Sequence, residues 1–167
     1  MSTPPDRALA LVASLRGQLS HLVLATSSAS GEPHASTAPA CLDDAGRLGI
    51  CVSGLAEHTR NLLGRPRASV LLLGNGTEPG SAFARPRLTF SCAVRPLARS
   101  SPEAAAVLAG LRATCGPSAD LVAGLPDAQV FHLIPERGRL VAGFGAAYDV
   151  DPRDWSKLTP VGPPPKR

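Results

Sequence analysis

The apolar positions follow a helical spacing only near the start of the chain. Leu9, Val12, Leu15 and Leu19 recur three or four residues apart, with prolines before them and Gly17 near the end of the run. This spacing places the four side chains on one face of a helix. The sequence therefore predicts that one amphipathic helix opens the fold.

After residue 21 the apolar residues come in short runs or alternate with polar ones, and turn-forming residues separate the runs. Alternation with a period of two is typical of half-buried β-strands. The predicted strands cover residues 22–26, 33–42, 47–53, 68–73, 87–97, 129–134 and 139–144, with a turn at residues 136–138 between the last two. The predicted helices cover residues 54–63 and 104–113, the second after a helix start at Ser101-Pro102-Glu103, and residues 118–123 could form a further short one.

These elements favour a mainly β fold in which helices flank one antiparallel sheet. Six or seven strands, without a regular alternation of strand and helix, indicate a closed or nearly closed antiparallel barrel. A barrel of this size fills its own interior, so a ligand larger than a few atoms has to bind outside it or between subunits. We therefore expect a homodimer, with a single domain over residues 1–150 and a Pro-rich C-terminal tail over residues 151–167.

The composition is that of an ordinary globular protein. The 167 residues fit one domain, and 44% of them are hydrophobic and 18% charged. No apolar run approaches the roughly 20 residues of a membrane-spanning helix. The first residues lack the basic and apolar regions of a secretory signal. We expect a cytoplasmic protein that does not bind membranes.

The net charge of +4 comes almost wholly from arginine, because Lys157 and Lys166 are the only lysines. Arginine suits bidentate binding of phosphate or carboxylate. Nucleic-acid binding is not expected, since it needs clustered basic residues with stacking aromatics, and the chain has one Trp, one Tyr and four Phe. The four cysteines lack the paired spacings of zinc or redox sites, so no metal site is predicted.

The densest polar cluster lies where a predicted strand ends and a helix begins. Unpaired backbone N–H groups and the helix dipole attract anions at such a point. The hydroxyls of Ser53 and Thr59 and the guanidinium of Arg60 supply further donors. The segment also holds His58 and Asn61, and it is a candidate phosphate site. The alternative is a capped surface helix with a solvated arginine.

Two further pairs of residues could contact an anionic ligand. Arg85 and Arg87 are two apart in an extended segment, so they share one face and could bind one anionic group. The alternative is a charged strand edge that discourages aggregation. His34 and Ser36 likewise share a face of the second predicted strand. No catalytic triad or carboxylate pair can be read from the order of residues, so the catalytic residues stay unassigned.

Four segments resemble the pyridoxamine-phosphate-oxidase-like FMN-binding split barrels, and specifically their haem-utilisation branch, the HugZ-type proteins. The segments are LATSSASGEPHASTAPACLDDAGRL, VSGLAEHTRNLLGRPRASVLL, FARPRLTFSCAVRPL and GRLVAGFGAAYDV, in that order. The resemblance spans residues 22–150. It implies a homodimeric split barrel with a cofactor in a cleft between the subunits.

The resemblance also implies two uses of that cleft. In the flavin-binding relatives, the phosphate of flavin mononucleotide (FMN) is held by residues that map here to Ser53, Thr59 and Arg60. In the haem-binding relatives the porphyrin takes the same cleft, and basic side chains near residues 85–87 can meet its acidic groups. The haem-degrading members carry an axial histidine beyond the glycine-rich GFG motif, whereas this chain has no histidine after His132.

That departure favours FMN, so the expected function is that of an FMN-dependent oxidoreductase related to pyridoxamine 5′-phosphate oxidase. The alternatives are a haem-binding or haem-utilisation protein that uses the same cleft, and a degenerate non-catalytic barrel. Tyr148 is a conceivable oxygen donor to haem iron, and Trp155 could cap a cofactor ring or anchor the terminal segment. The expected cofactor-binding residues are Ser53, His58, Thr59, Arg60, Asn61, Ser36, His34, Arg85 and Arg87.

Overall fold

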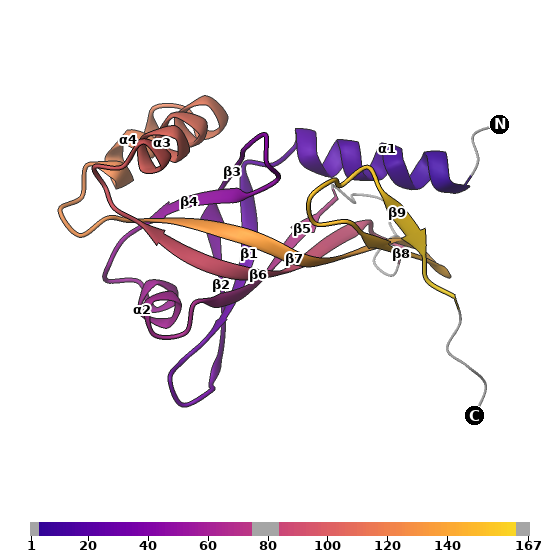
Figure 1. Ribbon diagram of the computed structural model, residues 1–167, viewed down its shortest axis with the longest axis horizontal. Coiled ribbons are helices and arrows are strands. Elements are labelled where there is room, and N and C mark those ends of the chain that lie inside the picture. The colour runs from indigo at the N-terminus through magenta and orange to yellow at the C-terminus, as the bar shows by residue number, and fades with distance from the viewer. Residues whose placement is uncertain (1–3, 75–83, 163–167) are drawn as a thin grey trace.

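One curved antiparallel sheet forms the body of the protein (Figure 1). The computed structural model describes residues 4–74 and 84–162. The main path of the sheet runs β2-β1-β5-β6-β7-β4-β3, while β8 pairs with β7, and β9 pairs with β8. The strands are β1 (His21–Ser27), β2 (Pro33–Pro39), β3 (Cys41–Leu42), β4 (Leu48–Val52), β5 (Arg67–Leu73), β6 (Arg87–Leu97), β7 (Gln129–Gly143), β8 (Ala146–Val150) and β9 (Leu158–Pro160).

The sheet curves without closing. Within the described residues its two end strands, β2 and β3, do not pair with each other, although β2 lies near β4. The predicted mainly β architecture with flanking helices is therefore confirmed, in the form of a split barrel. The predicted strand over residues 33–42 is interrupted, because Ala40 leaves the β1–β2 ladder and donates its N–H to the Ser20 carbonyl instead.

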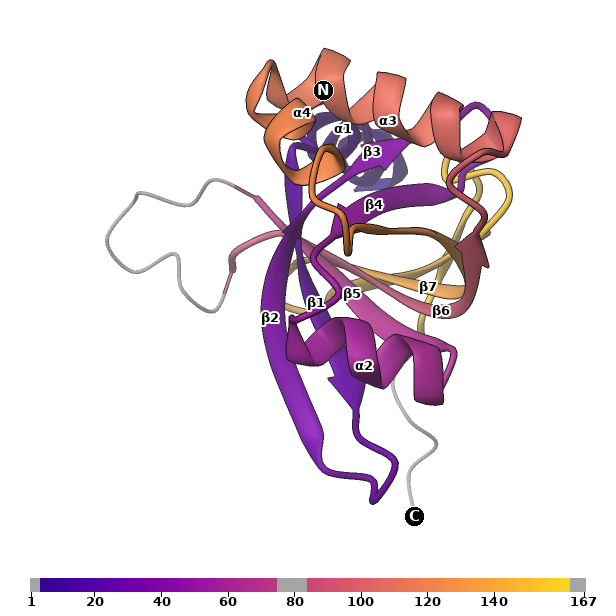
Figure 2. The same ribbon diagram turned by 90° about the vertical axis from the view of Figure 1, so that its left-hand side faces the viewer.

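Helices cover two opposite sides of the sheet (Figures 1 and 2). Helices α1, α3 and α4 lie on one side, and α2 lies on the other. Their bounds are α1 (Pro4–Gly17), α2 (Glu57–Gly64), α3 (Pro102–Cys115) and α4 (Ser118–Ala123). Helix α3 begins as the sequence predicts, since the Ser101 hydroxyl accepts a hydrogen bond from the Ala104 N–H. None of the described helices is long and apolar enough to cross a membrane.

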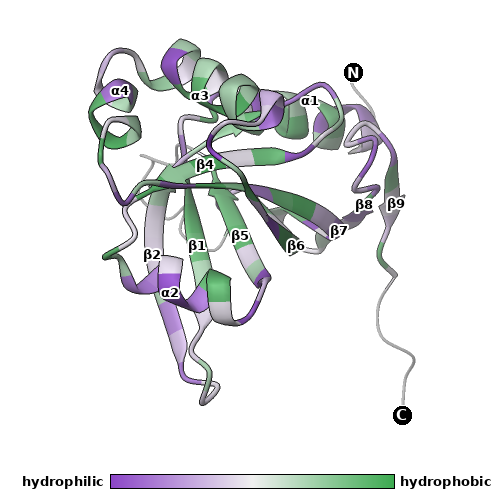
Figure 3. Cartoon of the chain, turned by 60° about the vertical axis from the view of Figure 1, so that its left-hand side comes forward, coloured by the Kyte–Doolittle hydropathy of each residue, from purple (hydrophilic) through white to green (hydrophobic). Residues whose placement is uncertain are grey.

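Apolar side chains fill the space enclosed by the strands. Alternate residues of β6 point inward, as expected of a half-buried strand, and Phe90 is fully buried in the same core as Phe131 and Leu140. Figure 3 shows that β1 and β5 are largely apolar, whereas α2 carries hydrophilic residues. The buried face of α1 differs slightly from the predicted one, because Leu9 is 37% exposed and Ala8 takes its place in the core.

Strand β7 corrects one prediction. The sequence suggested two strands around a turn at residues 136–138, yet β7 runs unbroken and pairs with β6 on both sides of that segment. The ladder shifts register between Ser91 and Cys92, and Pro135 is the residue opposite Cys92. A bulge tolerates a proline, which has no N–H to donate. The residues that imitate a turn therefore mark a bulge.

The segment after β7 extends the edge of the sheet. Strands β8 and β9 add to the sheet edge, and residues between them bring Trp155 into the core, where only 3% of its surface is exposed. Its ring lies 4.5 Å from that of Phe90, and the Arg16 guanidinium lies over it. Trp155 therefore anchors the segment to the barrel. Residues 163–167 lie outside the described residues.

The close contact of Gly138 with the core gives a test of this packing. A Cβ at Gly138 would lie 2.5 Å from Phe90 Cε1 and 2.8 Å from the Val150 carbonyl oxygen. We expect Gly138→Ala to lower the free energy of unfolding by about 1–3 kcal/mol, through overpacking. Urea denaturation measures this, with Gly17→Ala as the control, since a Cβ there meets nothing within 4 Å. Equal stability of the two variants would contradict the packing.

Candidate functional site

Helix α2 lies across the face of the β1–β2 hairpin that points into the protein. The register sets Thr26 opposite His34 and Leu24 opposite Ser36, and directly opposed residues share a face. Asn61 Nδ2 donates a buried hydrogen bond of 3.0 Å to Thr26 Oγ1. This bond fixes the orientation of α2 on the hairpin. The first turn of the helix therefore faces the inward side of β2.

Four polar side chains meet where α2 crosses β2. His58 Nδ1 lies 3.0 Å from Ser36 Oγ, and His34 Nδ1 lies 3.7 Å from Glu57 Oε1. We call His34, Ser36, Glu57 and His58 the α2 histidine cluster. The structure therefore brings the predicted pair of His34 and Ser36 together with His58, which the sequence placed in another cluster, and it adds Glu57, to which the sequence gave no role.

The second nitrogen of His58 has no partner. Its Nε2 is buried and forms no hydrogen bond among the described residues. Burial lowers the pKa of His58, and the neighbouring His34 lowers it further, so the imidazole is neutral at pH 7. A buried polar atom without a partner costs about 1–3 kcal/mol. Such an atom in a candidate site is a position where a bound group can supply the missing contact.

Arg60 is the available cation of this region. It is exposed on α2, one helical turn after Glu57, and its guanidinium forms no hydrogen bond or ion pair with the part of the chain that the structure describes. A guanidinium without a protein partner can bind an anionic ligand bidentately. Asn61, by contrast, is buried and engaged by Thr26, so its role here is to hold the helix.

The carboxylate of Asp127 accepts hydrogen bonds from donors of the predicted phosphate site. Ser53 Oγ donates to Asp127 Oδ2 at 2.7 Å, and the Leu55 N–H donates to the same oxygen at 3.2 Å. The hydrogen bond from Ser53 is the main cause of a lowered pKa of Asp127. Thr59 is fully buried and donates to the Ser53 carbonyl at 2.6 Å. An anion could reach these donors only by displacing a carboxylate.

The two arginines of the second basic pair lie elsewhere. Arg87 is the first residue of β6, opposite Leu73 and Val141. Helix α2 follows β4, and β4 pairs with the start of β7, which lies beside the other end of β6. Arg85 Nε donates to the Gly74 carbonyl at 2.6 Å, and Arg87 donates to the Arg85 carbonyl. Within one chain these arginines and the α2 histidine cluster are therefore not one site.

Sequence reasoning missed Glu57 and Asp127 for different reasons. Glu57 is adjacent to His58. The sequence signal for its role would have been a carboxylate at a helix start, which can pair with a histidine on a neighbouring strand. Asp127 lies 74 residues from Ser53, in a segment between helix and strand, and no local pattern connects them. Only the pairing of β4 with β7 brings Asp127 to the start of α2.

The family model described as pyridoxamine 5′-phosphate oxidase matches residues 11–142. Among known proteins, the haem oxygenase HutZ of Vibrio cholerae serotype O1 is 37% identical over 133 residues, which are 80% of this chain and 75% of HutZ. The crystal structure of HutZ, which describes it as a haem storage protein, matches this chain with a TM-score of 0.70 and 33% identity. The similarity covers 75% of this chain and 87% of the HutZ chain.

Two further solved structures are similar over most of this chain. A haem-binding protein from Mycobacterium smegmatis has a TM-score of 0.77 and 26% identity, and Campylobacter jejuni ChuZ has a TM-score of 0.78 and 25% identity. Each similarity covers 93% of this chain, but only 61% and 64% of the respective structures. Both of these proteins therefore contain segments that have no counterpart in the aligned part of this chain.

The lowered pKa of His58 predicts a loss of stability in acid. The unfolded chain takes up a proton at this residue as the pH falls below about 6.5, while the folded protein resists it until a lower pH. The free energy of unfolding therefore decreases as the pH falls from 7.5 to 5. We expect His58→Gln to reduce this decrease, measured by urea denaturation at both pH values.

His21→Gln is the matched control, because it removes an exposed imidazole from the start of β1. An identical dependence on pH in the wild type and in His58→Gln would show that burial of His58 contributes nothing to it.

Proposed function

The chain belongs to the pyridoxamine 5′-phosphate oxidase family, in its HugZ-type branch, and we propose that it serves haem utilisation by binding haem against helix α2. The similarity to HutZ over four fifths of the chain carries the proposal, because HutZ is described both as a haem oxygenase and as a haem storage protein. The histidines and the arginine around α2 also support the proposal, because side chains of these types can bind haem.

His34 suits the role of an axial ligand. Its side chain is 29% exposed, and its Nδ1 faces the carboxylate of Glu57, so Nε2 is the nitrogen left for a metal. A carboxylate behind the imidazole is the usual arrangement at metal-bound histidines, because it fixes the ring and raises its basicity. The pair therefore offers what haem iron requires of a protein, without a histidine in the C-terminal segment.

Arg60 and His58 suit the rest of the ligand. Arg60 has no partner among the described residues, and a guanidinium pairs well with a propionate carboxylate. The unpartnered Nε2 of His58 lies in the same cluster and could contact a polar atom of the ligand or its bound water. Bound haem would supply an iron that can bind oxygen and exchange electrons, and these residues would hold and orient it.

FMN remains the second candidate, supported by the description of the family model. It is the weaker one for this chain, because the Ser53 hydroxyl and the adjoining amide that would bind its phosphate are engaged by Asp127. A phosphate would have to displace a carboxylate that is itself stabilised by two donors. A degenerate barrel that binds neither cofactor is the third outcome that experiment can distinguish.

We further propose that two copies associate through the outward face of β1 and β2. The side chains of Val23, Ala25, Ala35, Thr37 and Pro39 lie on this face, and none of the five is charged. Four of the five are exposed in the single chain. An uncharged strand surface of this kind is typical of a subunit interface. His34 lies on the other face of β2, so the sheet itself would separate this interface from the α2 histidine cluster.

A haem titration tests the proposed ligand. We expect the wild type to develop a Soret band on addition of haem. His34→Ala should weaken binding by more than about tenfold and change the spectrum, and Glu57→Gln should weaken it by about tenfold through loss of the supporting carboxylate. His21→Ala is the control, because it removes an exposed histidine that lies outside the cluster.

A parallel fluorescence titration with FMN separates the candidates. Unaltered haem binding by His34→Ala would exclude His34 as the ligand. Binding of FMN and not of haem by the wild type would overturn the proposed function, and binding of neither would indicate the degenerate barrel.

Sedimentation equilibrium tests the proposed interface. We expect a dimer for the wild type and a shift toward monomer for Ala35→Arg, since the substitution places an unpaired charge in the contact between the two subunits. Ala29→Arg, in the turn between β1 and β2, is the control for an added arginine. A monomeric wild type, or a dimer that Ala35→Arg leaves intact, would rule out this face.

A further inference from the structure

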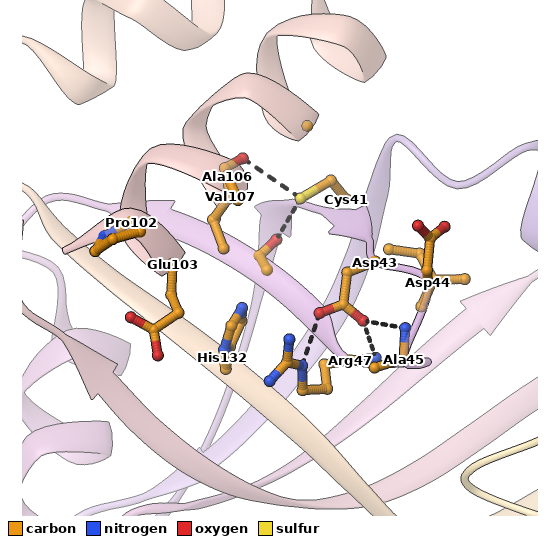
Figure 4. A pocket seen from close by; sticks show the side chains of 13 residues that line it. Cys41, Asp43, Asp44, Ala45, Arg47, Pro102, Glu103, Ala106, Val107 and His132 are labelled. Atoms are coloured by element: carbon orange, nitrogen blue, oxygen red, sulfur yellow. Dashed lines mark hydrogen bonds and ion pairs between the residues drawn. The ribbon is translucent and has the colours of Figure 1, made fainter.

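A pocket lies between α3 and the β3–β4 hairpin (Figure 4). Its volume is about 590 Å³, within the range of sites that hold small molecules. None of its lining residues belongs to the α2 histidine cluster. Leu42, Ala106 and Val107 give it apolar walls, while charged side chains stand at its rim and His132 lies at its base.

The base of the pocket is one row of residues across four paired strands. The row runs from Cys41 on β3 through Gly49 on β4 and His132 on β7 to Arg95 on β6. Residues opposed in this way share a face of the sheet. A Cβ at Gly49 would lie 2.8 Å from Val107 Cγ1, so the glycine lets α3 approach one side of the row. His132, next to Gly49, remains open to the pocket.

The hydrogen bond to Arg95 determines the state of His132. Only 3% of the residue is exposed, and its Nδ1 lies 3.2 Å from Arg95 Nη2. A guanidinium can only donate, so Nδ1 accepts and the proton of the neutral ring is on Nε2. Burial, and then the charge of Arg47, lower the pKa of His132, which keeps the ring neutral. Among the described residues the Nε2–H has no acceptor.

Two ion pairs flank this donor. On one side Asp43 Oδ2 accepts from Arg47 Nε at 2.7 Å, and Asp43 Oδ1 accepts from two backbone N–H groups. On the other side Glu103 lies 3.4 Å from Arg95 Nη1. In Figure 4 the His132 ring stands between Glu103 and Arg47. Both carboxylate oxygens of Asp43 are thus engaged, whereas the terminal nitrogens of Arg47 still have N–H groups that can donate to a ligand.

Asp44 completes the arrangement. It lies at the exposed tip of the β3–β4 turn, lines the pocket, and forms no hydrogen bond or ion pair within the described ranges. The pocket therefore has donors at its base, from His132 and Arg47, and an unpaired carboxylate at its rim. A phosphate dianion would meet the negative rim, and the described residues contain no group of three side chains that could hold a metal ion.

We propose that this pocket binds a small zwitterion, an amino acid or a short peptide with an apolar side chain. The carboxylate of the ligand would accept from His132 Nε2–H and from Arg47, and its ammonium group would pair with Asp44. The apolar side chain would lie against Leu42 and Val107. The proposal goes beyond haem binding and does not depend on it.

NMR of the full chain labelled with ¹⁵N-histidine tests the site directly. We expect His132 to show the Nε2–H tautomer, and its nitrogen resonances to shift on addition of millimolar L-leucine or leucyl-leucine. Whichever of the two acts at the lower concentration identifies the free amino acid or the peptide as the preferred form. N-acetyl-leucine, which lacks the ammonium group, and leucinamide, which lacks the carboxylate, should bind several-fold more weakly.

Asp44→Asn provides the matched test, because the residue is exposed and its loss leaves the fold intact. We expect it to weaken leucine binding by about fivefold, the effect of one exposed ion pair. Glu32→Gln, in the turn between β1 and β2, removes an exposed carboxylate far from the pocket and should change nothing. The proposal fails if no probe shifts His132, if the blocked probes bind as well as leucine, or if Asp44→Asn binds like the wild type.

Discussion

The pairing of β6 with β7 is the constraint on which the rest of the structure depends. The eleven residues of β6 pair with β7 along their whole length, across one bulge. The first part of β7 also pairs with β4 and its last part with β8, while β5 and then β1 and β2 attach to the other edge of β6. The loop after β4 leads to α2, and the hairpin that α2 crosses is carried by β5. Both candidate sites are therefore positioned by the same two strands.

Each site holds a histidine whose partial or complete burial keeps it neutral. Burial is the largest cause of the lowered pKa in His58 and in His132. In each ring one nitrogen is engaged, by Ser36 or by Arg95, and the other has no partner among the described residues. A neutral imidazole with one fixed nitrogen presents a defined donor or lone pair to a ligand. The difference lies in the neighbours, because His58 lies beside a second histidine, whereas His132 lies between two ion pairs.

Much of the fold could be predicted from local pattern, because alternation and helical spacing report on burial. The inward residues of β6 and the start of α3 are examples. Local pattern failed where a distant partner decides the outcome. Residues 136–138 imitate a turn, but the pairing of β7 with β6 makes them part of a strand. The role of Trp155 also depends on a distant partner, because the sequence leaves open whether it caps a cofactor ring or anchors the segment, and its contact with Phe90 places it in the core.

The same distinction applies to the site. His34, Ser36, His58 and Arg60 could be proposed from residue type and position, and the structure groups the first three. The hydrogen bond of Ser53 could not be foreseen, since the carboxylate that accepts it belongs to Asp127, in the loop between α4 and β7. That contact engages the Ser53 hydroxyl and the Leu55 N–H, two donors that the local sequence shows as available to an anion. Long-range pairing thus decides chemistry that the local sequence leaves open.

The most direct measurement is a crystal structure of the protein grown with haem. Binding at α2 predicts the porphyrin against the α2 histidine cluster, with His34 bonded to the iron and Arg60 beside a propionate. Haem located elsewhere on the chain, with this cluster unchanged, would contradict it.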